Sequence, residues 1–121
     1  MAESRKQAQQ YGRFGELLGS LALRFKGYRI LARGYRTPVG EIDLVARRGE
    51  MLVFIEVKAR RDITTAATAI HRRQQNRIIR AAQAYVQEHA NLTNLNIRFD
   101  ALLVSRNQWP VHVVDAWRPE D

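Results

Sequence analysis

Two kinds of hydrophobic spacing alternate along the chain and divide it into helices and strands. Apolar residues recur three or four positions apart over residues 4–26 and 69–90, a spacing that predicts two amphipathic helices. Shorter apolar stretches bounded by turn-forming residues predict strands at residues 28–35, 41–47, 51–59, 97–104 and 111–117. The resulting order, α-β-β-β-α-β-β, predicts an α/β fold with a mixed sheet of about five strands flanked by helices.

The first predicted helix has two distinct faces. Its apolar stripe is the face expected to pack on the core of the protein: Phe14, Leu17, Leu18, Leu21 and Phe25. A second face carries three glycines: Gly12, Gly15 and Gly19. Tight packing of the helix against the sheet is favoured over contact with a ligand as the reason for these glycines. Glu16 lies among these glycines and off the main apolar stripe.

The second predicted helix also separates apolar from charged residues. Its apolar stripe contains Ile78, Ala82, Tyr85, Val86 and His89. The face away from this stripe is almost purely basic, which indicates either a solvated helix or a surface that contacts phosphates: Arg73, Arg77 and Arg80, with Arg72 flanking them. The preceding segment, 60–68, has no clear period and is predicted to be a loop whose threonines cap the helix.

Length and composition place limits on the class of protein. A chain of 121 residues favours a single domain over 1–121, with residues 1–10 and 118–121 expected to be flexible. The absence of cysteine excludes disulfides and thiolate metal sites. No apolar run approaches the roughly 18 residues that span a bilayer, and the first ten residues lack the apolar centre of a signal peptide. We therefore expect a cytoplasmic protein with no membrane partner.

The chain is strongly basic, with 20 Lys and Arg against 12 Asp and Glu and a net charge of +8. Seventeen of the basic residues are Arg, whose planar guanidinium suits phosphate oxygens, so nucleic acid is the first partner to consider. A generally Arg-rich proteome explains the composition equally well. The residues expected to hold phosphates are basic residues of the two predicted helices: Arg5, Lys6, Arg13, Arg72, Arg73, Arg77 and Arg80.

The segment 40–60, GEIDLVARRGEMLVFIEVKAR, places carboxylates where core strands usually carry aliphatic residues. Side chains of a strand alternate between its two faces. The faces expected from this alternation hold Glu41, Asp43 and Val45 on the first strand, and Leu52, Phe54, Glu56 and Lys58 on the second. The acids of the two strands can therefore lie on the same face of the sheet.

The turn between these two strands decides how close the acids come. A tight turn at residues 48–49 would pair Asp43 with Phe54 and Glu41 with Glu56. Asp43 and Glu56 would then lie diagonally on one face, within reach of a shared ion. A slip of one residue in this register would place them on opposite faces.

Three carboxylates on one sheet face repel each other and need a compensating cation. Lys58 offsets one charge, whereas a divalent ion such as Mg²⁺ would offset two and take oxygen ligands from Asp43 and Glu56. A lysine beside that ion can orient or help deprotonate an attacking water, or stabilise charge on a phosphate, which suits phosphodiester hydrolysis. The alternative is a salt-bridge ladder between the strands, and the short pattern by itself favours the ladder.

The segments GEIDLVA and LVFIEVKAR, after an upstream helix with GRFGELLGSLAL, resemble a family of small bacterial YraN-like proteins described as endonucleases. That family resembles restriction-endonuclease-like nucleases with the PD-(D/E)xK signature, and archaeal Holliday-junction resolvases in particular. The likeness covers about residues 11–104. It implies a restriction-endonuclease-like fold, a DNA substrate that is branched or otherwise structured, and, by analogy only, a homodimer.

The resemblance also implies a role for individual residues. Asp43 matches the first metal-binding carboxylate of the signature, Glu56 the second, and Lys58 the signature lysine. The carbonyl of Val57 would be a backbone metal ligand, and Glu16 resembles a helix glutamate that resolvase-like members place near the metal. The implied cofactor is Mg²⁺ or Mn²⁺.

The sequence leaves different functions open. The first is a Mg²⁺- or Mn²⁺-dependent endonuclease in which Asp43, Glu56 and Lys58 are catalytic and hydrolyse DNA phosphodiesters. The second is a non-catalytic nucleic-acid-binding module that retains the nuclease fold, and a third is a protein–protein adaptor with a basic face. Asp100, in an otherwise apolar strand, is expected to form a buried ion pair with an arginine rather than to support catalysis.

Overall fold

A computed structural model of the chain describes the backbone of residues 5–119 and the side chains of residues 13–119. Its helices and strands are α1 (Arg5–Phe25), β1 (Arg29–Thr37), β2 (Gly40–Arg48), β3 (Met51–Ala59), α2 (Ile63–Ala67), α3 (Arg72–Glu88), the 3₁₀ turn η1 (Ala90–Leu92), β4 (Asn96–Val104) and β5 (Val111–Trp117). Over the described residues the strands form one five-stranded sheet in the order β1-β2-β3-β4-β5. All neighbours are antiparallel except β3 and β4, which are parallel.

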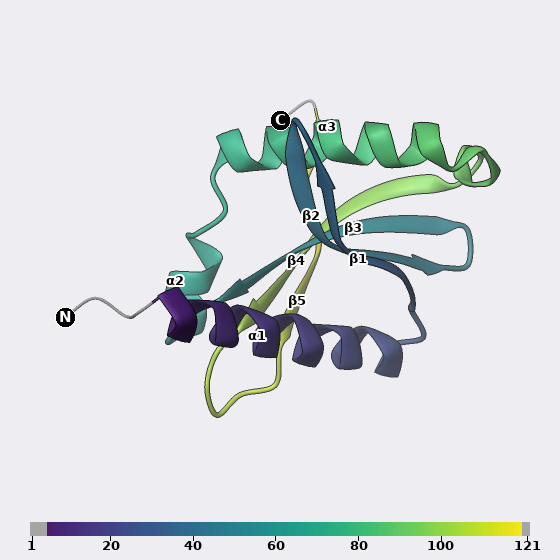
Figure 1. Cartoon of the computed structure of the whole chain (residues 1–121). Helices are drawn as coiled ribbons and strands as arrows, with labels where there is room; N and C mark the ends of the chain where they lie inside the picture. Colours follow the sequence, from purple (N-terminus) through teal and green to yellow (C-terminus); the bar gives the residue numbers. More distant parts are fainter. Residues whose placement is uncertain (1–4, 120–121) are drawn as a thin grey trace.

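The helices cover the two faces of this sheet, with α1 on one side and α3 on the other (Figure 1). The chain crosses from β3 to the parallel strand β4 through α2 and α3, because parallel neighbours need a long connection. The predicted α/β fold and its mixed sheet of five strands are confirmed. None of the described helices is both long and apolar enough to cross a membrane.

Each face of the sheet has its own buried apolar cluster. On the α3 face, Phe54 stacks on Phe99 with ring centroids 5.8 Å apart and meets Tyr85 edge-on. On the α1 face, Leu23 packs with Val53 and other aliphatic residues of the sheet. Strands buried on both faces are central in a sheet, which explains the near-continuous apolar runs of β3 and β4.

The apolar stripe predicted to bury α1 lies on the outside of the protein, so that expectation is wrong. Phe14 is 54% exposed, Leu17 60%, Leu21 45% and Phe25 78%. The buried face of α1 is instead the one that carries the glycines. This finding leaves a large apolar surface on the outer side of the helix.

The glycines of α1 determine which face packs because they allow the closest approach to the sheet. A Cβ added to Gly15 would lie 3.1 Å from Ala59 Cβ, and one added to Gly19 would lie 2.9 Å from Leu102 Cδ1. Tight helix–sheet packing, the favoured explanation for these glycines, is therefore confirmed at both positions. Gly12 lies outside the residues whose packing is described.

The segment before α3 differs from its prediction as a loop. It contains the short helix α2, where the Asp62 carboxylate caps the N-terminus by accepting a hydrogen bond from Thr65 N–H at 2.8 Å. The threonine cap predicted for the following helix is wrong, because the N-cap of α3 is His71, whose side chain makes no capping hydrogen bond. The predicted apolar stripe of α3 is buried at Ile78, Ala82 and Tyr85. His89 stacks on Tyr85 and shares a 2.7 Å hydrogen bond with its carbonyl, so it is a packed residue at the end of the helix.

Candidate active site

The β2–β3 hairpin has a different register from the predicted one. The two strands pair from Arg48 with Met51 to Leu44 with Ile55, around a two-residue turn in which Gly49 has a left-handed φ of 61°. The loop is therefore residues 49–50 and not the expected residues 48–49, so that Gly49 takes the first of the two loop positions, where its positive φ favours glycine. Each residue of β2 therefore pairs with a residue two positions further along β3 than expected. A shift of two positions in the partner does not change the face on which its side chain lies.

This register brings Asp43 and Glu56 closer than the predicted diagonal arrangement. One step beyond the pair of Leu44 and Ile55, Asp43 comes directly opposite Glu56. The ladder of backbone pairs stops there, and Asp43 Oδ2 instead accepts a hydrogen bond from Val57 N–H at 2.8 Å. The carboxylate of Asp43 is thus tied to the backbone of the strand that carries Glu56.

Side-chain alternation along β2 breaks at Asp43, contrary to the regular strand expected from the sequence. Ile42 packs in the core cluster on the α3 face, whereas Leu44, two positions on, packs in the cluster on the α1 face. Val45 joins Ile42 on the α3 face and so does not share a regular face with Asp43. On the neighbouring strand the facing residue, Gly34, has a left-handed φ of 58°. Local irregularity in both strands frees the Asp43 carboxylate from the core.

The environment of Glu56 disfavours its charged form. Glu56 is only 6% exposed. Burial is the largest of the causes that together raise its pKa to about 9, followed by the hydrogen bond and the negative charge of Asp43. Lys58 acts in the opposite direction, with its Nζ 3.6 Å from Glu56 Oε1. Without another cation, the raised pKa therefore favours the protonated form of Glu56 at neutral pH.

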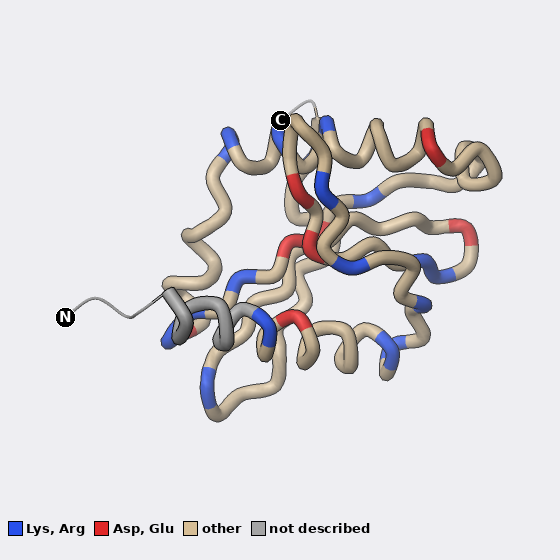
Figure 2. The backbone as a smooth tube through the Cα atoms, viewed as in Figure 1, with Lys and Arg blue, Asp and Glu red and all other residues tan. Residues whose placement is uncertain are grey.

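Glu16 approaches this pair from α1. It is half-buried, and its pKa is raised by burial first and then by the negative charges of Asp43 and Glu41, with Arg33 acting against them. Figure 2 shows the acidic positions of α1, β2 and β3 gathered near the middle of the molecule. The structure therefore brings Glu16 within electrostatic range of Asp43, on the side of α1 that faces the sheet.

The donor set of this cluster can be compared with what a metal requires. Among the residues whose side chains are described, no three His, Asp or Glu are grouped closely enough to hold an ion. Asp43 and Glu56 provide two adjacent carboxylates, and Val57 lies between Glu56 and Lys58 with its N–H bonded to Asp43. Mg²⁺ in proteins is commonly held by one or two carboxylates and keeps several waters. The two carboxylates fit that ion, and Glu16 would reach it only through water or a change of rotamer.

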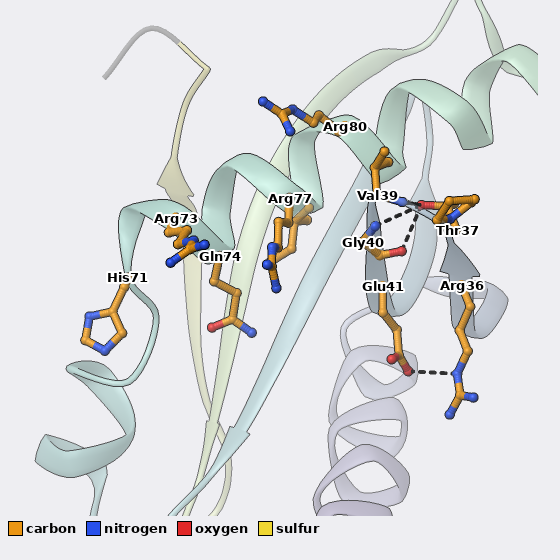
Figure 3. Close-up of a pocket in the computed structure, with 12 residues that line it drawn as sticks. Arg36, Thr37, Val39, Gly40, Glu41, His71, Arg73, Gln74, Arg77 and Arg80 are labelled. Carbon is orange, nitrogen blue, oxygen red and sulfur yellow. Dashed lines mark hydrogen bonds and ion pairs between the residues drawn. The ribbon is translucent and has the colours of Figure 1, made fainter.

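A basic groove lies beside the acidic cluster. It has a volume of about 1140 Å³ and runs between the β1–β2 turn and the first half of α3 (Figure 3). Its cationic lining is formed by arginines from both elements: Arg36, Arg73, Arg77 and Arg80. Glu41, which is two residues from Asp43, also lines the groove and pairs with Arg36 at 3.5 Å. The groove and the carboxylate pair are therefore linked through β2, which carries both Glu41 and Asp43.

Close packing fixes the shape of this groove. A Cβ added to Gly40 would lie 2.5 Å from the carbonyl oxygen of Arg77, so the β1–β2 turn rests directly on the backbone of α3. Thr37 Oγ1 holds the turn itself by donating to Gly40 O at 2.9 Å and accepting from Gly40 N–H at 3.0 Å. The spacing between the arginines of the two elements is consequently set by backbone contacts.

The basic residues predicted to hold phosphates are not all in the groove. Arg72 donates to the carbonyls of Arg118 and Pro119, each at 2.9 Å, and so fastens the end of the chain to α3. Arg13 is exposed on α1. The side chains of Arg5 and Lys6 lie outside the described residues. Arg36 was not among the predicted residues, although its position at the end of a strand next to Thr37 and Pro38 is a usable signal.

Asp100 is separate from this site, as expected. It is completely buried, and Arg98 contacts both of its oxygens at 2.8 Å. His112 Nε2 lies 2.7 Å from Oδ2, and Asp115 N–H donates to Oδ1 at 2.9 Å. Burial alone would raise the pKa of Asp100, but the hydrogen bonds from His112, Arg98 and Asp115 together lower it. The ion pair predicted for Asp100 is confirmed.

Fold and site together define an α/β protein with a single mixed sheet, a pair of acids in which Glu56 is buried and Asp43 half-buried, and an arginine groove that includes part of the same strand β2. The model of the uncharacterised protein family UPF0102 matches residues 15–104, and the chain belongs to this family.

Similar proteins cover nearly the whole chain. A UPF0102 protein of Parvibaculum lavamentivorans is 47% identical over 112 residues, which are 93% of this chain and 84% of the relative. The UPF0102 protein of Mesorhizobium japonicum is 48% identical over 114 residues, or 94% and 91% of the two chains. That of Maricaulis maris is 48% identical over 121 residues, or 100% and 95%. The matched part of the family includes the carboxylates and the groove.

Proposed function

We propose that this protein is a Mg²⁺- or Mn²⁺-dependent nuclease that hydrolyses phosphodiester bonds of DNA in the cytoplasm. The observation that supports this most is the pairing of Asp43 with a buried Glu56, next to a lysine. A buried carboxyl group with a raised pKa, such as Glu56, held against a second acid is unfavourable for stability, which is typical of residues kept for a function.

Each residue of the site would have a role that follows from its position. Asp43 and Glu56 would hold the ion, with the carbonyl of Val57 and, through water, Glu16 as further ligands. Bound Mg²⁺ or Mn²⁺ supplies Lewis acidity toward the phosphate oxygen and a lower pKa of coordinated water. Lys58 would orient the attacking water or stabilise the negative charge that develops on the phosphate.

The groove supplies the substrate side of this proposal. Arg73, Arg77 and Arg80 project from one helix and Arg36 from the facing strand, so DNA phosphates would contact cations on both sides (Figure 3). Such contacts position the backbone without reading its sequence. A branched or otherwise structured DNA is the substrate class that we propose for this sequence-independent surface.

The decisive experiment incubates the purified protein with labelled junction, duplex and single-stranded DNA in the presence of Mg²⁺ or Mn²⁺. We expect cleavage of at least one substrate, and a loss of about 10²-fold or more in rate for Lys58→Ala. If neither the wild type nor Lys58→Ala cleaved any of the substrates above a protein-free blank, the nuclease proposal would be refuted.

A second candidate is a nucleic-acid-binding module that retains the site without turnover. It is favoured by the absence, among the described side chains, of a third acid grouped with Asp43 and Glu56. Metal affinity separates the two candidates. In a calorimetric titration with Mn²⁺, a functional site gives binding that Asp43→Asn abolishes, whereas a vestigial site gives the same curve for both proteins.

A further inference from the structure

The outer face of α1 carries a continuous apolar surface. Phe14, Leu17, Leu21 and Phe25 are all 45% exposed or more. Trp109, in the loop from β4 to β5 that runs beside α1 (Figure 1), is 53% exposed and meets Phe25 edge-on at 6.0 Å. Taking a large apolar side chain as roughly 200 Å², these five expose on the order of 500 Å². This is at the upper end for a surface that remains in water.

Three of the exposed residues of α1 form a symmetric series with the half-buried Leu18, and Leu17 lies beside this series. Phe14, Leu18, Leu21 and Phe25 are separated by four, three and four positions. This spacing is a seam along one side of a helix, and the natural complement of such a seam is another helix. When two copies pair antiparallel about a two-fold axis, Phe14 of one meets Phe25 of the other, and Leu18 meets Leu21. The seam is therefore complementary to itself.

We propose that this face is a homodimer interface in which the α1 helices of two copies pack antiparallel. Two such faces remove on the order of 1,000 Å² of apolar surface from water, which reaches the size of a specific interface. The proposal is independent of the nuclease chemistry, because it involves the side of α1 that faces away from the sheet. It also accounts for an α1 stripe that the fold of one chain leaves unburied.

Charges around the seam give this dimer an unusual salt dependence. The exposed cations Arg13, Arg24 and Lys26 flank the stripe. The two-fold arrangement brings Arg13 of one copy next to Lys26 of the other, where they repel. Salt screens that repulsion, so the dimer should become tighter as salt increases. Binding of the same face to an anionic lipid surface or to nucleic acid would become weaker instead.

Sedimentation velocity tests the proposal on the full chain at protein concentrations from about 1 µM to about 1 mM, in NaCl from about 50 mM to about 500 mM. We expect a monomer–dimer equilibrium that shifts toward dimer with salt. Leu17→Gln and Phe25→Gln should each weaken the dimer at least tenfold, since every substitution acts twice in a two-fold interface. Ile97→Gln, at a residue that is 48% exposed on β4, is the matched control and should leave the dimer unchanged.

A charge reversal tests the pairing itself. Arg13→Glu places an acid opposite Lys26 of the second copy, so the dimer should tighten and its salt dependence should reverse. Circular dichroism of each variant verifies the fold, which substitutions at exposed positions should preserve. A monomer under all conditions, or a dimer that Leu17→Gln and Phe25→Gln leave intact, would overturn the proposal. So would a monomer that floats with phosphatidylglycerol vesicles through Phe25, because that result assigns the face to lipid.

Discussion

Asp43 Oδ2 accepts a hydrogen bond from Val57 N–H at 2.8 Å, at the point where the backbone pairing of β2 and β3 ends. A side-chain carboxylate thus replaces a strand-to-strand backbone bond. This bond fixes Asp43 opposite Glu56, and it leaves the second oxygen of Asp43 for another partner. The position of the carboxylate pair is therefore a property of the hairpin backbone and not of flexible side chains.

The carboxylate pair should make the metal-free protein less stable as pH rises. The folded-state pKa of Glu56 is raised to about 9, so its contribution to stability is complete below the unfolded pKa near 4.5 and is lost progressively up to pH 9. Glu56→Gln removes this penalty and should raise the free energy of unfolding at pH 8 in EDTA by on the order of 1 to 3 kcal/mol. Urea unfolding of wild type and Glu56→Gln at pH 5, 7 and 8.5 measures the difference.

The control for that experiment is Glu50→Gln, in the exposed turn between the same two strands. It should follow the wild-type pH profile within about 0.5 kcal/mol. If Glu56→Gln also ran parallel to the wild type across this pH range, the carboxyl of Glu56 would not be buried beside Asp43 as the structure has it.

Asp100 should behave in the opposite way with pH. Its folded pKa is lowered, so the stability it provides is present above the unfolded pKa near 3.8 and is lost as pH falls through the folded value. Asp100→Asn leaves Arg98 buried without its counter-charge and should cost about 3 to 5 kcal/mol at pH 7. Asp115→Asn, which removes the more exposed pair with Arg118, should cost much less than Asp100→Asn. Chemical denaturation compares the two, and equal losses would contradict the assignment.

The five strands and the two long helices could be read from the sequence because of their hydrophobic patterns, whereas the five-residue helix α2 lies in a segment without a clear period and was predicted as a loop. The face of α1 that packs on the sheet could not be read in the same way, because two of its faces were candidates for burial. Leucine and phenylalanine define the more apolar one, but Gly15 and Gly19 define the one that can approach the sheet. The hydrophobic period shows which face of a helix is more apolar, but it does not show how closely the helix backbone can approach its neighbour.

The candidate site was similarly predictable in its residues and not in its geometry. Asp43, Glu56 and Lys58 stand out as charged positions in apolar strands. Their arrangement depended on whether Gly49 takes the first or the second position of the tight turn and on a break in alternation at Asp43, and neither leaves a signal in the hydrophobic pattern. The bonds from Arg72 to the carbonyls of Arg118 and Pro119 could not be predicted either, because these partners are far away in the sequence.

The groove arginines should determine how DNA binding depends on salt. Removing one phosphate contact lowers the slope of log K against log salt by about 1. Arg77→Ala and Arg80→Ala should each show this decrease, whereas Arg72→Ala should leave the slope unchanged because its guanidinium is bonded to backbone carbonyls. Fluorescence anisotropy with a labelled duplex in EDTA measures binding without cleavage. An effect of Arg72→Ala as large as that of Arg77→Ala would show that the groove is not the binding surface.

Gly40→Ala should link the stability of the hairpin to DNA binding. The new Cβ would lie 2.5 Å from the backbone oxygen of Arg77, a contact that only a movement of the turn away from α3 can relieve. We expect a loss of about 1 to 3 kcal/mol in the free energy of unfolding and weaker DNA binding, since Arg36 would move away from Arg73 and Arg77. Val39→Ala, at the neighbouring exposed position, is the control and should change neither quantity by more than a small amount. Unfolding and anisotropy measured on both variants decide the question: full affinity in a destabilised Gly40→Ala protein would mean that the two sides of the groove bind DNA independently.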